Sequence, residues 1–393
     1  MLINNTRALA YTSKILWIKP IEGADNIELV GVLGWTCIAK KGEFQVGDLC
    51  VYFEIDSKLP EAEWSEFMRT KNFKVKTMKL NKFKVISQGL ALPFSTFSNI
   101  DLPQEENIDL TTKLEITYAD AADNRRKAAS ADKYKLMAQR HGKLFSKQPF
   151  RWLMRRTWGK KLLFVFFGKK KDKKNGWPAW VVKTDEERCQ NMPWLFPGDK
   201  EKEWIATEKI DGTSTTFTMK GFGRSREFYI CSRNVVFDKP DKKCFYETNV
   251  YTEMAEKYNI EEVLAEILFR YSSVCNFITI QGETYGEGIQ KRDYGLKEHK
   301  FMAFNVILGY EDGHTERLNP MEMTDLLFQF DIPCVPIVDE HFIIPETCDE
   351  LLVLAGGASA VDGGMREGLV FRSYDGTESF KAVDNAFLLK YHG

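Results

Sequence analysis

The chain has 393 residues, of which 44% are hydrophobic and 13% aromatic, enough to build cores in two globular domains. Its eight cysteines form no C-x-x-C pair and its five histidines no H-x-x-x-H pair, which disfavours a structural zinc site and is typical of reduced cytosolic thiols. No apolar run approaches the roughly 20 residues of a membrane span, and the N-terminus lacks the basic start of a signal peptide. We therefore expect a soluble, cytoplasmic monomer that does not bind membranes.

The net charge of −1 hides one strongly basic segment. Residues 124–174 contain eighteen lysines and arginines against two aspartates, a charge of +16, so the remainder carries about −17. Phe150, Trp152 and Trp158 interleave these charges. The segment is compatible with a solvated linker or insertion, or with a surface that follows phosphates and stacks on bases. Attachment to an anionic membrane would need an amphipathic helix with a clean apolar face, which cannot be traced here.

The first hundred residues alternate in the manner of short strands, with glycine-containing turns at 41–43 and 46–48. Several short strands with little helix predict a small β-barrel, and an OB-fold is the obvious candidate for a nucleic-acid enzyme. The expected strands are residues 15–18, 27–30, 36–39 and 49–54.

From Trp177 onward the chain mixes strands and helices, which predicts an α+β domain. Asn259 followed by Glu262 resembles a capping box, and apolar residues follow at helical spacing. Residues 277–280 and 368–371 are typical of strands. The predicted organisation is an OB domain at 1–119, a basic linker or insertion at 120–176 and the α+β domain at 177–393.

The most informative segment runs Glu208, Lys209, Ile210, Asp211, Gly212 and lies between two strand-like stretches. A lysine at a strand end, with a carboxylate two residues on and a glycine that permits a tight turn, suits a nucleophilic amine facing a phosphate. Taken alone, this pattern is more typical of a surface turn with a solvated lysine.

Further segments follow in a fixed order and supply carboxylates at Glu283 and Glu367, an aromatic ring at Phe304 and a lysine at Lys381. Each has an ordinary explanation by itself, because glutamates at strand ends are commonly solvated and a phenylalanine fits a core. Together the series resembles motifs I, III, IIIa, IV and V of the covalent nucleotidyltransferases, which transfer AMP or GMP through lysine. The matching segments are residues 208–214, 281–286, 301–306, 366–371 and 379–383.

Within that superfamily the chain looks like an RNA ligase, because no arginine follows Gly212 closely, where DNA ligases usually have one. The N-terminal region is similar to the OB domain of RNA ligase family 5, and so is the stretch 183–188. This resemblance implies an OB domain in front of an adenylyltransferase domain, and sealing of nicks whose 3′-hydroxyl strand ends in RNA. It leaves the basic segment unmatched. The similar N-terminal segments are residues 20–25, 41–44, 46–48, 52–56 and 86–90.

The resemblance also implies a mechanism. Lys209 would attack the α-phosphate of ATP, release pyrophosphate and pass AMP to the 5′-phosphate of a nick in RNA or an RNA-containing duplex. The 3′-hydroxyl would then displace AMP. Asp211 and Glu367 would hold Mg²⁺ or Mn²⁺ through water, and Glu283 would join that shell or bind the ribose.

Other positions acquire roles from the same motifs. Phe304 would stack on adenine and Lys381 would clamp the α-phosphate. Many relatives carry two lysines spaced K-x-K in the last motif, whereas here Val383 occupies the second position. Either Lys390 replaces that lysine or Lys381 works alone.

The remaining expected nucleotide contacts come from two places. Arg233 and Asn234 resemble motif Ia and would contact the nucleotide or the 5′-phosphate. Glu208, Ile210 and Gly212 flank the lysine and would line the same pocket.

Two other classes of protein stay open at this point. A DNA ligase or GTP-dependent capping enzyme shares the motifs, but only twelve residues follow Lys381, which leaves no room for the C-terminal OB domain of those enzymes. A non-catalytic OB-fold RNA-binding protein is disfavoured because no required position is lost apart from the second lysine.

Overall fold

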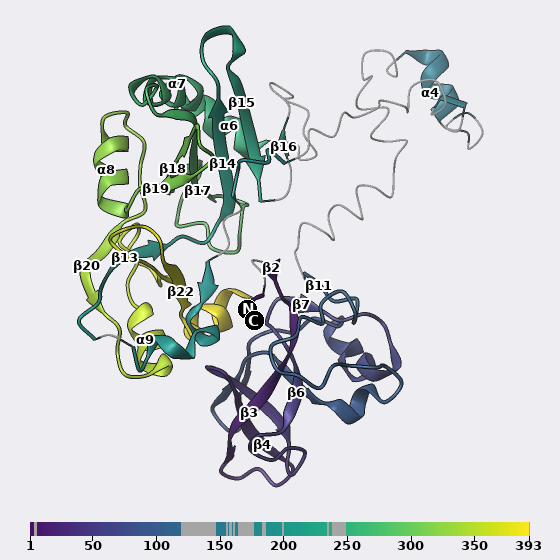
Figure 1. The fold of residues 1–393 in the computed structure, drawn as a ribbon. Coiled ribbons are helices and arrows are strands. Elements are labelled where there is room, and N and C mark those ends of the chain that lie inside the picture. Colours follow the sequence, from purple (N-terminus) through teal and green to yellow (C-terminus); the bar gives the residue numbers. More distant parts are fainter. Residues whose placement is uncertain are drawn as a thin grey trace.

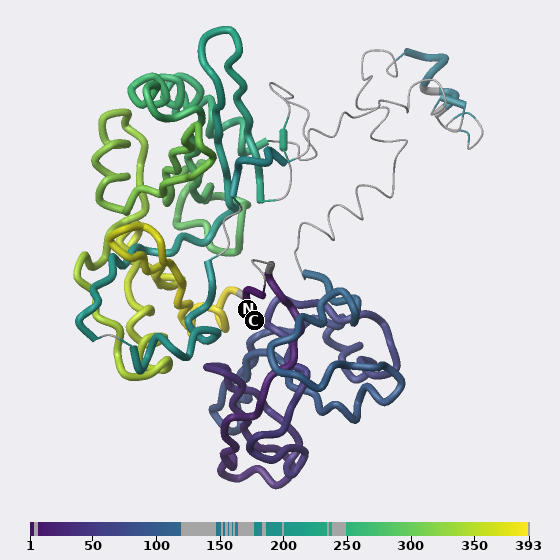
Figure 2. Tube along the Cα trace, in the orientation of Figure 1, coloured from purple at the N-terminus to yellow at the C-terminus, as the bar shows by residue number. Residues whose placement is uncertain are grey.

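The computed structural model shows two lobes (Figure 1). The N-terminal lobe is purple to blue, and the larger lobe runs from teal through green to yellow. Both chain ends lie where the lobes meet (Figure 2), and Met1 and Leu388 pack on the same hydrophobic cluster. The structure describes residues 1–3, 6–118, 147–154, 156, 159, 162–163, 177–182, 186–198, 200–233, 236–237 and 249–392.

The N-terminal lobe is built on a five-stranded antiparallel sheet in the order β10-β6-β3-β4-β5. The first half of the long strand β3, Ala10–Pro20, pairs with β6 and the second half pairs with β4, so the sheet curls into a half-barrel. A register shift between Ile15 and Trp17 marks the bend. Gly31 lies against Trp17, where a Cβ would come within 2.1 Å of the ring. The other strands are β4 Ile27–Val32, β5 Trp35–Lys40, β6 Leu49–Phe53 and β10 Leu90–Pro93.

Both faces of this sheet are buried in separate cores. Neighbouring residues of β6 point to opposite faces, so Tyr52 packs with Tyr11 and Trp35, while Phe53 packs with Phe97. All four predicted strands of the OB domain are confirmed. The remaining elements are β1 Leu2–Ile3, β2 Thr6–Arg7, β7 Ser57–Lys58, η1 Glu63–Lys71, β8 Met78–Leu80, β9 Val85–Ser87, η2 Phe94–Phe97 and β11 Thr117–Tyr118.

The larger lobe contains two sheets, which confirms the predicted α+β class. The first has the order β12-β22-β21-β13-β20, with β12 parallel to β22, and the second has the order β16-β15-β14-β17-β18-β19. The first sheet contains β12 Glu187–Arg188, β13 Glu203–Lys209, β20 Ile337–Ile343, β21 Gly368–Arg372 and β22 Ser379–Val383. The second contains β14 Thr213–Lys220, β15 Glu227–Ser232, β16 Val236–Phe237, β17 Cys275–Gly286, β18 His299–Tyr310 and β19 Thr315–Arg317.

Helices cover one face of each sheet. Leu264 and Ile267 of α7 pack with Ile278 and Ile280 of β17, and Leu351 of α9 packs in the core of the first sheet. The helices are α4 Gln148–Met154, α6 Val250–Lys257, α7 Ile260–Arg270, α8 Pro320–Phe328, α9 Cys348–Ala355 and α10 Asn385–Phe387. Short turns of helix are η3 Cys189–Asn191, η4 Pro193–Leu195, η5 Gly223–Ser225 and η6 Leu388–His392.

The start of α7 differs from the prediction. The helix forms, but the Asn259 side chain makes no capping hydrogen bond, so the predicted capping box is wrong. Asn259 instead adopts a left-handed conformation with φ of 48°, because α6 ends only two residues earlier and the chain must reverse there. Asparagine tolerates this conformation better than most residues.

Most of the basic segment lies outside the described residues. Its described part includes α4, in which Trp152 is exposed. No described helix is long and apolar enough to cross a membrane.

Leu264→Ala tests the core between α7 and β17. Leu264 is fully buried, so we expect the substitution to lower the free energy of unfolding by about 2 to 5 kcal/mol in urea titrations. Phe269→Ala in the same helix, where the ring is 73% exposed, serves as the control and should change it by less than about 1 kcal/mol. An equal loss of unfolding free energy in Leu264→Ala and Phe269→Ala would contradict this packing.

Candidate active site

Lys209 lies where the two sheets of the larger lobe meet. It is the last residue of β13 in the first sheet, and the turn 210–212 leads into β14 of the second. Lys209 pairs with Gly368 of β21, directly after Glu367, while the start of β14 pairs with β17 at Glu283. Strand pairing therefore brings one carboxylate from each sheet to the lysine.

The Lys209 ammonium donates to the Glu367 carboxylate at 2.8 Å. The Lys209 side chain is 26% exposed and that of Glu367 is 9% exposed, so the pair is largely shielded from water. Burial alone would lower the pKa of the Lys209 ammonium, but the charges of Glu367, Glu283 and Asp211 outweigh it and raise the pKa. Lys209 is therefore protonated at neutral pH until this negative charge is balanced.

Glu283 is a buried carboxyl whose protonation is set by burial and by the charges around it. Burial is the main cause that raises its pKa, to about 8, and the charges of Glu367 and Asp211 add to it against the opposing charges of Lys209 and Arg233. This carboxyl is therefore mostly protonated at pH 7. A further cation at the site would favour its ionised form.

Hydrogen bonds fix the turn that joins the two sheets. The Asp211 backbone N–H donates to the Tyr294 hydroxyl at 2.7 Å, and the Gln290 amide donates to the Gly212 carbonyl at 2.8 Å. A Cβ on Gly212 would come within 2.3 Å of the Thr284 carbonyl oxygen. The glycine is thus needed because the turn passes directly over β17.

Glu208 is buried, and both of its carboxylate oxygens are occupied. The Ser359 hydroxyl donates to one oxygen, and the Ala360 N–H donates to the other at 2.7 Å. In this structure Glu208 therefore holds the loop 356–366 in place. On the other side of the motif, Ile210 and Phe304 belong to one apolar cluster with Tyr285, Tyr294 and Val335.

The side chains of β22 alternate between two environments. Phe380 and Ala382 pack in the core of the first sheet. Val383, on the same face as Lys381, is 3% exposed and packs in a core of the N-terminal lobe. A lysine at position 383 would bury its ammonium among apolar side chains. Val383, at the position where many relatives have the second lysine, therefore helps to join the two lobes.

The other predicted basic residues lie at different distances from the site. Lys390 is exposed, and its described contact is with the Tyr391 ring, 4.9 Å from the centroid, rather than with the carboxylates around Lys209. Arg233 is 5.2 Å from the centroid of the Tyr118 ring, and its charge lowers the pKa of Glu283, so it faces the site. Asn234 lies outside the described residues.

Asp211, Glu283 and Glu367 surround Lys209 without converging on one point. Within the described ranges, no three histidine, cysteine, aspartate or glutamate side chains lie close enough together to hold one metal ion. In the described part of the chain the three carboxylates therefore do not form a direct ligand set, and their role around metal-bound water stays a prediction.

Comparison with known proteins agrees with this geometry. Residues 202–392 match the family model described as RNA ligase, and residues 9–94 match one described as an OB-fold domain. The chain carries an RNA ligase domain behind an OB-fold domain. Among curated proteins, none matches the chain.

Solved structures of an RNA ligase from Naegleria gruberi resemble the whole chain. The structure with pyrophosphate is 28% identical, with a TM-score of 0.71, and the match covers 98% of each chain. A lysine-to-alanine mutant with ATP and Mn is 27% identical, with a TM-score of 0.71, over 98% of this chain and 99% of that one. The similarity extends across both lobes.

Three residues of the RNA ligase domain support the site but were not predicted. Arg292 is buried, lies 3.9 Å from the centroid of the Tyr294 ring and pairs with Asp362 at 2.5 Å. Tyr294 in turn accepts the hydrogen bond from the Asp211 N–H. These residues lie in loops without periodic patterns, so no sequence signal marked them.

Glu367→Gln tests the charge balance in the RNA ligase domain. Removing the carboxylate charge 2.8 Å from Nζ should lower the pKa of Lys209, so that more of the amine is neutral at a given pH. Competitive acetylation of the full chain across pH, read by mass spectrometry, reports this pKa as the midpoint of Lys209 labelling. The control Glu378→Gln removes the exposed partner of Lys202 and should leave that midpoint in place. An unchanged midpoint in Glu367→Gln would refute the account.

Proposed function

We propose that this chain is an ATP-dependent RNA ligase that forms an AMP adduct on Lys209. It seals nicks with 3′-hydroxyl and 5′-phosphate ends, and the 3′-hydroxyl strand ends in RNA. The observation that carries the proposal is the Lys209 amine, 2.8 Å from Glu367 at the sheet junction of an RNA ligase domain.

The solved structures support these roles. The Naegleria gruberi enzyme is described with pyrophosphate, with ATP and Mn, and with AMP and Mn. Its substituted residues include a lysine and an aspartate two positions apart, the separation of Lys209 and Asp211 here. They also include a glutamate and a lysine fourteen positions apart, the separation of Glu367 and Lys381.

The first chemical step joins Lys209 to the α-phosphorus of ATP. The new bond forms between Nζ and phosphorus while the bond from phosphorus to the bridging oxygen breaks, and pyrophosphate leaves with that electron pair. On the way from ammonium to phosphoramidate Nζ loses two protons. The first leaves before the attack, and the Glu367 carboxylate at 2.8 Å is its adjacent acceptor. The second leaves as the bond to phosphorus forms and passes to solvent. Lys381 lies on β22, which pairs with β21, the strand next to that of Lys209, and it supplies positive charge to the α-phosphate.

The side chains around Lys209 fit a divalent cation such as Mg²⁺ or Mn²⁺. They are carboxylates, the ligands such ions prefer. Burial is the main cause of the raised pKa of Glu283, and the charges of Glu367 and Asp211 add to it. Asp211 and Glu367 would hold the ion largely through water, and Glu283 would join them or bind the ribose. When bound, the ion supplies positive charge that favours the neutral amine of Lys209.

The base and the acceptor strand meet other parts of the site. Phe304, at the edge of the apolar cluster that contains Ile210, stacks on adenine. Glu208 contributes by holding the loop 356–366 and thereby shaping the pocket. Arg233, which faces Glu283, binds the 5′-phosphate of the nick.

Incubation with α-labelled ATP and Mg²⁺ tests the covalent step. We expect acid-labile label on the wild-type chain and none on Lys209→Ala, because Lys209 is the amine that contacts Glu367 and senses the charges of Glu283 and Asp211. Lys202→Ala is the matched control: its partner is the exposed Glu378, and label should persist. Label on Lys209→Ala, or transfer from GTP alone, would contradict the proposal.

The 3′-end preference needs a separate measurement. We expect nicks with ribonucleotides on the 3′-hydroxyl side to be sealed at least tenfold faster than all-DNA nicks. Equal rates on both substrates would remove the RNA preference and leave the adenylation step standing.

Deletion of residues 124–174 tests the basic segment. Its charge of +16 predicts weaker binding to nicked duplexes and a shallower salt dependence, while self-adenylation stays nearly intact. A matched variant keeps the length of the segment but replaces the lysines at 169–171 and 173–174 by glutamine. Its nick affinity and salt dependence should lie between those of the wild type and the deletion. Unchanged nick affinity and salt slope in the deletion would assign the segment another purpose.

A further inference from the structure

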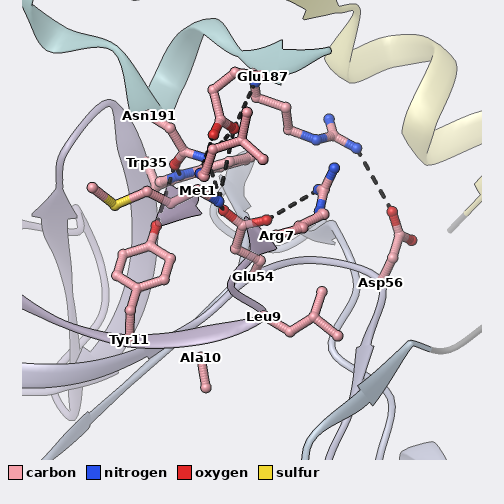
Figure 3. Close-up of polar contacts among 12 residues, drawn as sticks. Met1, Arg7, Leu9, Ala10, Tyr11, Trp35, Glu54, Asp56, Glu187 and Asn191 are labelled. Carbon is pink, nitrogen blue, oxygen red and sulfur yellow. Dashed lines mark hydrogen bonds and ion pairs between the residues drawn. The ribbon is translucent and has the colours of Figure 1, made fainter. Parts of the chain in front are cut away.

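The OB-fold lobe and the RNA ligase lobe are joined around one buried side chain, Asn191. It ends η3, directly after β12, and is 1% exposed. The residues around it come from three strands or strand ends of the OB-fold lobe, as Figure 3 shows. They are Tyr11 of β3, Trp35 of β5 and Glu54 after β6, all fully buried.

The Asn191 amide uses its complete hydrogen-bonding capacity. Its Oδ1 accepts from the Trp35 indole at 2.6 Å and from the Tyr11 hydroxyl at 3.2 Å. Its Nδ2 donates to Glu54 at 2.7 Å and to Glu187 at 2.8 Å. Because an indole only donates and a carboxylate only accepts, a single amide orientation satisfies all four partners.

The charge of Glu54 is balanced at the same place. Burial would raise the pKa of Glu54, but the Arg7 guanidinium at 3.0 Å, the Met1 amino group and the Asn191 amide outweigh it and lower the pKa. The carboxylate thus stays an acceptor for the amide. Replacing Asn191 by an acid would place a third carboxylate beside Glu54 and Glu187.

Three further contacts surround the amide. The Gly34 N–H donates to the Gln190 carbonyl at 2.8 Å, and Arg188 pairs with Asp56 at 3.6 Å. Val383 of β22 adds an apolar contact to the core of the OB-fold lobe. The two lobes are therefore joined by directional, buried bonds and do not merely touch.

This junction is continuous with the active site. Strand β12 runs parallel to β22, and Arg188 is the register partner of Lys381. Asn191 lies three residues after Arg188, and Val383 lies two residues after Lys381. We propose that Asn191 is a positioning residue: its amide fixes the OB-fold lobe against β12 and β22 and so sets the place of Lys381. The catalytic part of this inference rests on the proposed function.

The test compares Asn191→Asp, Glu54→Gln and their combination in the full chain. Asn191→Asp alone places a carboxylate beside those of Glu54 and Glu187, and their repulsion should separate the lobes. Small-angle X-ray scattering should therefore show a larger radius of gyration. The double variant restores one amide–carboxylate pair with the groups exchanged, and should return the radius toward that of the wild type. The rate of self-adenylation at saturating ATP should fall about 10- to 100-fold in Asn191→Asp and recover in part in the double variant.

Asn319→Ala is the matched control, because it removes two N-cap hydrogen bonds of α8 away from the junction. It should leave both the radius and the adenylation rate unchanged. If Asn191→Asp does not fold, Trp35→Phe deletes one donor to the same amide while keeping an aromatic ring, and should show both effects at smaller size.

Wild-type scattering together with wild-type rates in Asn191→Asp would overturn the inference, and so would an opened molecule that adenylates normally. Scattering reads the docking of the lobes without any reaction. A wild-type chain that takes no label from ATP would therefore refute the proposed function and leave the docking measurement standing.

Discussion

The chemistry of this chain depends on one constraint: an ammonium group and three carboxylates share a confined place where two sheets meet. Lys209 ends a strand of one sheet, and four residues later, at Thr213, the chain has entered the other. The carboxylates raise the pKa of Lys209 against its burial, whereas burial is the main cause that raises the pKa of Glu283, with the charges of Glu367 and Asp211 adding to it. Such a site favours added positive charge, and in the proposed function that charge favours the neutral, nucleophilic amine of Lys209. Hydrogen bonds through Glu208 and Tyr294 hold the surrounding loops against this turn.

The second organising feature is the junction of the lobes. A surface charge pair contributes little to stability, but a buried amide with four partners is costly to disturb, because each lost bond leaves a buried polar group unsatisfied. Asn191 therefore specifies one relative placement of the OB-fold and ligase lobes. Strand β22 carries Lys381 and Val383 on the same face, and Val383 packs in the core of the OB-fold lobe. In the proposed role of Asn191, the docking of the two lobes and the placement of Lys381 thus depend on the same short strand, β22.

Much of this architecture could be predicted from sequence, because its signals are local. Alternation predicted the strands of the OB-fold lobe. The ordered series of motifs, through its family resemblance, marked the turn that begins at Lys209 as the candidate reactive turn. Asn259 was misassigned as a helix cap because the pattern of a capping box does not show that the preceding helix ends two residues away. Asn191 and Arg292 were not predicted at all. Their partners lie far away in sequence, and a buried amide or guanidinium has no periodicity to reveal it.

The absence of a second lysine in the last motif shows how packing and chemistry compete for one position. Residues 381 and 383 point to the same side of β22, and in this chain that side meets the OB-fold lobe. A lysine at 383 would either desolvate its ammonium or push the lobes apart, whereas valine closes the junction. Arg188, the register partner of Lys381 on the adjacent strand, likewise serves the junction, because its guanidinium pairs with Asp56 of the OB-fold lobe. The strand can close the junction at this position or carry a second cation there, but it cannot do both.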